Sequence, residues 1–117
     1  MMKNPALLVR IEVAKRIEDE KLAEMIQDPS EWVRREVARR IDPSRLPEMM
    51  NDPEWLVRAM VAQRIHPSRL PEMMWDSDYG VRQAVARRVD LRFAAIIMMK
   101  EPSPEIREII ENRVKQL

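Results

Sequence analysis

A 24-residue repeat is the feature that most constrains how this chain can fold. The octet PSRLPEMM occurs at 43–50 and again, without a change, at 67–74. A unit of 24 residues cannot bury its apolar face alone, so this period predicts a stack of units that pack on their neighbours. The repeated text V-R-x-x-V-A-x-R-I aligns in LVRIEVAKRI (8–17), WVRREVARRI (32–41), LVRAMVAQRI (56–65), GVRQAVARRV (80–89) and, displaced by one residue, EIREIIENRV (105–114).

The first half of each unit is predicted to be an α-helix. Val33, Val37 and Ile41 are spaced i, i+4 and i+8, which places them in one stripe along a helix. We expect Asp28 to be the N-cap, with a proline at the first helical position and Glu31 completing a capping box. Asp52 and Asp76 recur at the same position of later units.

The second half of the unit is shorter and contains a proline that disfavours regular α geometry. Asp42 can cap a turn that Pro43 opens, but Pro47 then lies inside the segment. A single turn of 3₁₀ helix or a very short α-helix is therefore expected, with Leu46 and Met49 facing the stack.

Together the two halves predict an all-α solenoid that forms a single domain over residues 1–117. Glycine occurs once and charged residues make up 35% of the chain, which favours helices with solvated faces over sheets that need turn glycines. The expected repeats, about four and a half, cover roughly 4–27, 28–51, 52–75, 76–100 and the partial unit 101–117.

The motif D-P-x-x-x-V-R-x-x-V-A resembles the second-helix text of HEAT repeats, although the period is too short for two full HEAT helices. The chain is similar to the leucine-rich repeat variant family over roughly residues 4–114. That resemblance implies a right-handed superhelix in which an α-helix alternates with a short 3₁₀ helix. Some members of the family carry a cysteine-ligated iron–sulfur cluster, which does not carry over because this chain has no cysteine. No cofactor is expected.

Two columns of arginine recur with the repeat. The first lies inside the apolar arc of the helical wheel, where a guanidinium must be paired because an unpaired buried charge is very costly. Its natural partners are Asp28, Asp52 and Asp76, and HEAT-like repeats contain such an Asp/Arg ladder. This first column consists of Arg10, Arg34, Arg58, Arg82 and Arg107. The second column lies in the last helical turn, where a cation complements the macrodipole. It consists of Arg16, Arg40, Arg64, Arg88 and Arg113.

An apolar strip flanked by basic residues is the candidate surface for a protein partner. On the wheel Leu8, Trp32 and Leu56 share an outward column. Arg35 and Arg39 are predicted to lie beside it at solvent positions, which gives a strip of the hot-spot type. Trp55 and Tyr79 are placed at the edge of the core, where they either cover the seam between repeats or extend the strip.

The two ends of the stack are predicted to differ. Glu111 replaces an alanine of the other copies and gives the C-terminal unit a polar outer face, as a terminal repeat requires. Leu7, Leu8 and Ile11 instead leave the first helix apolar. We expect a partner there, or a homodimer formed through the first helix.

Composition and motifs argue against several classes of function. There is no catalytic triad or metal site to assign, because the chain lacks cysteine and His66 is its single histidine. A net charge of +1 and a patchy basic face make nucleic acid an unlikely ligand. No apolar run is long enough to span a membrane, and a cytoplasmic setting is expected.

The function predicted from the sequence is therefore that of a non-enzymatic scaffold or adaptor that binds another protein. A nucleic-acid-binding solenoid that uses a local basic patch is the alternative.

Overall fold

The computed structural model describes residues 5–117 and is built from α-helices and short 3₁₀ helices, labelled η. No strand occurs among these residues. The elements follow one another as α1 (Pro5–Arg16), α2 (Asp19–Leu22), η1 (Ala23–Met25), α3 (Glu31–Arg40), η2 (Pro43–Met49), α4 (Trp55–Arg64), η3 (Pro67–Met73), α5 (Tyr79–Arg88), η4 (Leu91–Phe93), α6 (Ala94–Lys100) and α7 (Pro104–Lys115).

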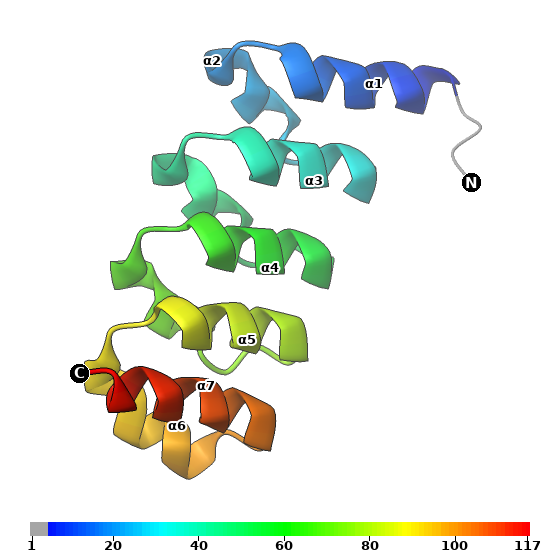
Figure 1. Ribbon diagram of the computed structural model, residues 1–117. Coiled ribbons are helices and arrows are strands. Elements are labelled where there is room, and N and C mark those ends of the chain that lie inside the picture. Colours follow the sequence, from blue (N-terminus) through cyan, green and yellow to red (C-terminus); the bar gives the residue numbers. More distant parts are fainter. Residues whose placement is uncertain (1–4) are drawn as a thin grey trace.

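The longer helices stack into one row, and the short segments form a second row against it (Figure 1). In the long row α1 contacts α3, α3 contacts α4, α4 contacts α5, and α5 contacts α7. The described part of the molecule measures 49 × 29 × 21 Å, the elongated shape of a stack. The predicted all-α solenoid, with a helix and a short helix in each unit, is confirmed.

The core runs between the two rows along the whole stack. The stripe Val33, Val37 and Ile41 is fully buried, and the equivalent residues of α4 and α5 are buried to the same degree. Leu46 and Met49 of η2 close the core from the other row. Burying one such aliphatic side chain contributes about 1.5–3 kcal/mol, so these columns hold each unit to the next.

The expected short helix is present as a 3₁₀ segment in the two units that carry the repeated octet. In η2 the side chain of Asp42 accepts a hydrogen bond from the backbone N–H of Ser44 at 2.9 Å. Pro47 lies inside the segment, where it has no N–H to continue α-type hydrogen bonding. In η3 the ring nitrogen Nδ1 of His66 accepts the corresponding bond from Ser68 at 3.2 Å.

The predicted starts of the longer helices were wrong by about two residues. Helix α3 begins at Glu31, and its N-cap is Ser30 rather than Asp28. Asp28 instead accepts from the backbone N–H of Ser30 at 2.9 Å, and Asp52 does the same with Glu54. Both carboxylates therefore fix the turn before the helix, as aspartate commonly does, and do not cap the helix.

Candidate interaction surface

The first arginine column links each unit to the next through carboxylates. Arg34 donates from Nε to Oδ2 of Asp52 at 2.8 Å, and from Nη1 to the backbone carbonyl of Asp28 at 2.8 Å. Arg58 repeats this arrangement with Oδ2 of Asp76 at 2.9 Å and the carbonyl of Asp52 at 2.8 Å. The hydrogen bonds to Asp76 raise the pKa of the Arg58 guanidinium. One guanidinium thus joins its own turn to that of the following unit.

The ladder continues to both ends of the described stack, with one change of residue type. Arg10 donates to Oδ2 of Asp28 at 3.1 Å. Arg82 donates instead to Oε1 of Glu101 at 3.0 Å, and Glu101 is only 3% exposed. The sequence reasoning did not identify Glu101. The one-residue displacement of the fifth copy was the available signal, because the ladder position shifts with it and here carries the longer acidic side chain.

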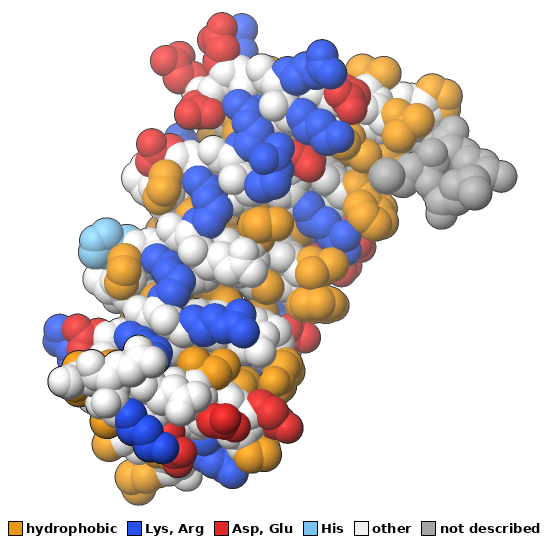
Figure 2. Space-filling model, in the orientation of Figure 1, with side chains coloured by type: hydrophobic (Ala, Val, Ile, Leu, Met, Phe, Trp, Pro, Cys, Tyr) orange, Lys and Arg blue, Asp and Glu red, His pale blue; other side chains and the backbone are white. Residues whose placement is uncertain are grey.

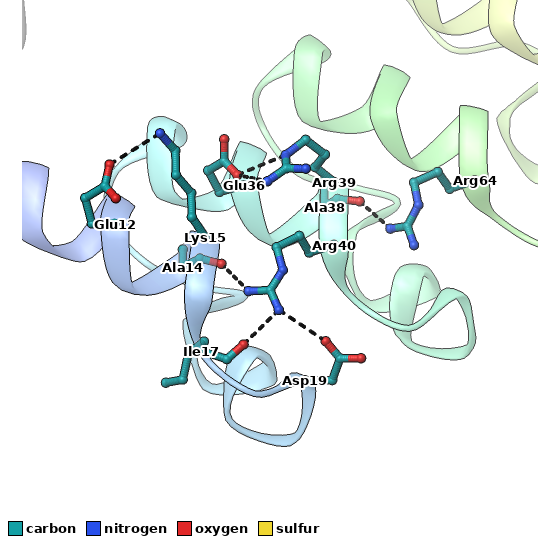
Figure 3. A network of polar contacts seen from close by, with 10 residues as sticks. All are labelled: Glu12, Ala14, Lys15, Ile17, Asp19, Glu36, Ala38, Arg39, Arg40 and Arg64. Carbon is teal, nitrogen blue, oxygen red and sulfur yellow. Dashed lines mark hydrogen bonds and ion pairs between the residues drawn. The ribbon is translucent and has the colours of Figure 1, made fainter.

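The second arginine column lies in the last helical turn, as predicted, and its guanidinium groups in addition bind the preceding helix. Arg40 donates to the backbone carbonyls of Ala14 at 2.6 Å and Ile17 at 2.8 Å, in the last turn of α1 (Figure 3). These carbonyls have no partner within a helix, so the guanidinium acts as their cap. The same contacts recur for Arg64 with Ala38 and Ile41, for Arg88 with Ala62 and Ile65, and for Arg113 with Ala86.

Most of the arginines are therefore engaged within the fold, although Figure 2 shows basic side chains in an interrupted column down one face. Arg39 is exposed and pairs with Glu36 at 2.7 Å. Arg35 is not a solvent position as predicted, since its side chain is 24% exposed and its Nε is buried without a hydrogen-bond partner. Its guanidinium stacks on the ring of Trp32 at 4.3 Å and donates to Glu31 at 2.6 Å.

Large apolar side chains project from the first turns of α3, α4 and α5 and from the corresponding turn of α1. They gather at the edge of the row in Figure 2, over the helix N-termini on the right. We call Leu8, Trp32, Trp55 and Tyr79 the first-turn ridge. Their exposed fractions are 44%, 42%, 46% and 43%.

The predicted strip is only partly assembled by the fold. Leu8 and Trp32 are exposed as expected, but Leu56 is half-buried, and the neighbouring Trp55 takes its place at the surface. The ring of Trp55 extends over α5, where a Cβ atom on Gly80 would lie 3.2 Å from it. Glycine at position 80 therefore leaves room for this ring, and Trp55 covers the seam between two units while part of it stays exposed.

The outer face of α1 is apolar, but its residues differ from those predicted. Ile11 is 8% exposed and belongs to the core, and Leu7 packs against that core. Both side chains face the stack, so neither can form the proposed end surface. The shallow groove on this face is lined by Leu8, Val9, Glu12, Val13, Arg16 and Ile17.

No features of a metal site or a membrane span were found in the described residues. No group of three or more histidines, aspartates and glutamates in residues 5–117 could hold a metal ion. None of the helices in this range has the length and apolar character to cross a bilayer.

Comparison with known proteins places the fold among helical repeats. Neither a family model nor a curated protein matches the sequence. A solved structure described as a leucine-rich repeat variant with a novel repetitive protein structural motif is 37% identical and superimposes with a TM-score of 0.85. The match covers 93% of this chain and 46% of that one, so this chain spans about half the length of that protein.

Proposed function

Because the chain is an α-helical repeat protein of the leucine-rich-repeat-variant type, we propose that it works as a non-enzymatic protein-interaction module that binds its partner on the first-turn ridge. Helical repeat folds commonly mediate protein interactions, and a row of equivalent helices offers an extended surface to a partner. We propose that the partner is another protein that presents an apolar segment to the ridge.

The observation that carries this proposal is the exposure of four large apolar side chains at equivalent ends of four neighbouring helices. The units of α3, α4 and α5 bury their valine columns almost completely, so apolar exposure at the starts of these helices does not reflect a loosely packed fold. Aromatic residues and arginine are enriched at the centres of protein interfaces. Trp32 stacked on Arg35 supplies both, and this contact holds the indole in place before a partner binds.

The columns of arginine support a protein partner over nucleic acid. A phosphate-tracking surface needs basic groups that are free along its length. Arg34 and Arg58 are held by carboxylates, and Arg40 and Arg64 are held by backbone carbonyls.

Site-specific photo-crosslinking in the native cell tests the proposal. A photoreactive amino acid at position 32 or 55 should capture one and the same protein, whereas the same group at Met99, which is 81% exposed at the other end, should not. Capture of nucleic acid at positions 32 and 55, or the same protein at all three positions, would contradict it.

The captured partner then allows a quantitative test with matched variants. Trp32→Ala and Trp55→Ala should each weaken binding by roughly 30-fold, the loss typical of a tryptophan hot spot. Trp75→Ala is the control, because Trp75 is as exposed as Trp55 but lies on the loop before α5 and outside the ridge. Equal losses for all three variants would place the interface elsewhere.

A further inference from the structure

The outer face of α1 is an uncovered copy of an interface that the rest of the stack buries. Val33, Val37 and Ile41 of the second unit are fully buried, because α1 packs over them. The equivalent residues of the first unit are Val9, Val13 and Ile17. Val9 is 61% exposed and Val13 is 40% exposed, since no helix precedes α1 in the described stack.

Arg16 on this face also lacks the partner that its equivalents have. In the following units the equivalent arginines each donate to carbonyls of the preceding helix. The side chain of Arg16 is 81% exposed, and the ion pair it forms among residues 5–117 is with Glu12, one turn earlier on the same helix, at 3.2 Å. The face thus carries an apolar stripe with an acid and a base along one edge.

The opposite end of the molecule differs from an interior unit at a close-packed position, which disfavours a head-to-tail stack of copies. Ala14 is buried although the described stack holds no unit before α1, so its column faces the following unit. In α5 this column holds Ala86, which is 1% exposed, and in α7 it holds Glu111. A second copy stacked on α7 would have to accommodate the large, charged side chain of Glu111 where the other units pack a small buried alanine, at a cost in free energy.

We propose that the outer face of α1 is the interface of a two-fold symmetric dimer, in which α1 of one protomer packs antiparallel on α1 of its partner. The stripe is symmetric in sequence about Val13, because Val9 and Ile17 lie one turn before it and one turn after it. With the two-fold axis at Val13, the two copies of Val13 face each other. Val9 of each protomer then faces Ile17 of the other.

The charges on this face favour the same arrangement. When the two helices are antiparallel, the two-fold axis that relates them is perpendicular to both. This axis keeps the Glu12–Arg16 edge of both protomers on the same side of the interface. With a rise of 1.5 Å per residue, Glu12 then lies within about 3 Å, along the helix axis, of the level of Arg16 in the other protomer. Two acid–base pairs would therefore form across the interface. A parallel pairing would place the two charged edges on opposite sides and would form none.

This inference is independent of the proposed function, because it requires neither tryptophan of the first-turn ridge. The two surfaces share only Leu8, which lies at the border of both. A failure of ridge binding would therefore leave the dimer standing, and the reverse also holds.

Sedimentation equilibrium of the purified chain at increasing concentration tests the dimer. The apparent mass should rise from 13.9 kDa toward twice that value and no further. Val13→Glu should abolish the rise, because it places two carboxylates at the two-fold axis. Val114→Glu is the matched control: Val114 is a helical valine that is 43% exposed at the other end of the stack, and its replacement should leave the association unchanged.

A charge exchange distinguishes this geometry from unspecific apolar contact. Glu12→Arg and Arg16→Glu should each weaken dimerisation by at least 10-fold, and the double variant should restore it to within a few-fold of the wild type. Circular dichroism confirms that each variant is folded. A wild-type chain that remains monomeric, masses beyond a dimer, or a double variant as weak as the single ones would each overturn the proposal.

Discussion

At the scale of single residues, two arginines in the same nine-residue text have different roles. The arginine after the first valine extends toward the next unit and binds a carboxylate there, as Arg58 binds Asp76. The arginine six positions later binds the preceding helix, as Arg64 does. A further arginine one position before it, Arg87 in α5, is exposed. Residue type alone therefore does not separate structural arginines from those available for binding.

Removing the ladder contact at Arg58 should destabilise the fold. Arg58 and Asp76 are 15% and 12% exposed, so Arg58→Ala leaves a carboxylate in a poorly solvated position. We expect a loss of roughly 2–4 kcal/mol in the free energy of unfolding, measured by urea denaturation. Arg87→Ala, at an exposed position of the next helix, should cost less than about 0.5 kcal/mol. Similar losses for the two variants would show that the ladder does not carry this stability.

At the scale of elements, the turns that start the short helices depend on an acceptor at a fixed position. Asp42 and Asp90 accept from the backbone two residues ahead, and His66 does so in the unit between them. Hydrogen bonds from Ser44, first from its side chain and then from its backbone, lower the pKa of Asp42. The backbone N–H of Arg92, followed by its side chain, lowers the pKa of Asp90.

These lowered pKa values predict a loss of stability in acid. The unfolded chain takes up protons on these carboxyls at a higher pH than the folded chain does, so the free energy of unfolding should fall as the pH drops below about 4. The variant carrying Asp42→Asn and Asp90→Asn keeps a capping side chain at both positions and cannot titrate there. It should be somewhat less stable than the wild type at pH 7, where the ionised carboxylates contribute, and lose less stability between pH 4 and 2. Identical acid profiles by circular dichroism would contradict the assignment.

At the scale of the whole molecule, the period determined what could be predicted. The spacing of Val33 and Val37 located the core, and Pro47 located the short 3₁₀ segment, because both depend only on local geometry. The surface was harder to assign. A wheel drawn for one helix placed Arg35 and Ile11 in solvent. In a stack, however, an interior helix has a neighbour on each side, so residues flanking the core stripe are also covered. Helix starts were misplaced because Asp28 fixes the preceding turn instead of capping α3.

Contacts between neighbouring units predict that one whole unit can be removed. Deleting residues 52–75 places Asp76 at the same distance along the chain from Arg34 as Asp52 has in the intact chain, so the ladder contact can form again. The deletion also places Arg88 where it can donate to the backbone carbonyls at the end of α3, as it now does to those at the end of α4. The shortened chain should keep its helical signal per residue and unfold cooperatively at a lower temperature. Deleting 52–69 instead breaks the register and should give an unfolded chain. Equal outcomes for the two deletions would contradict nearest-neighbour stacking.

The contacts of Arg40, Arg64 and Arg88 also bear on how such a chain can diverge over generations. Their acceptors are peptide carbonyls, which every amino acid supplies. A substitution in the preceding helix can therefore change a side chain without removing the contact, and selection needs to preserve only the arginine. The Asp/Arg ladder is less tolerant, because its contact between units joins two side chains and needs an acidic residue at the second position. We expect substitutions to accumulate first at the ladder positions. The arginines that bind backbone carbonyls should be retained for longer.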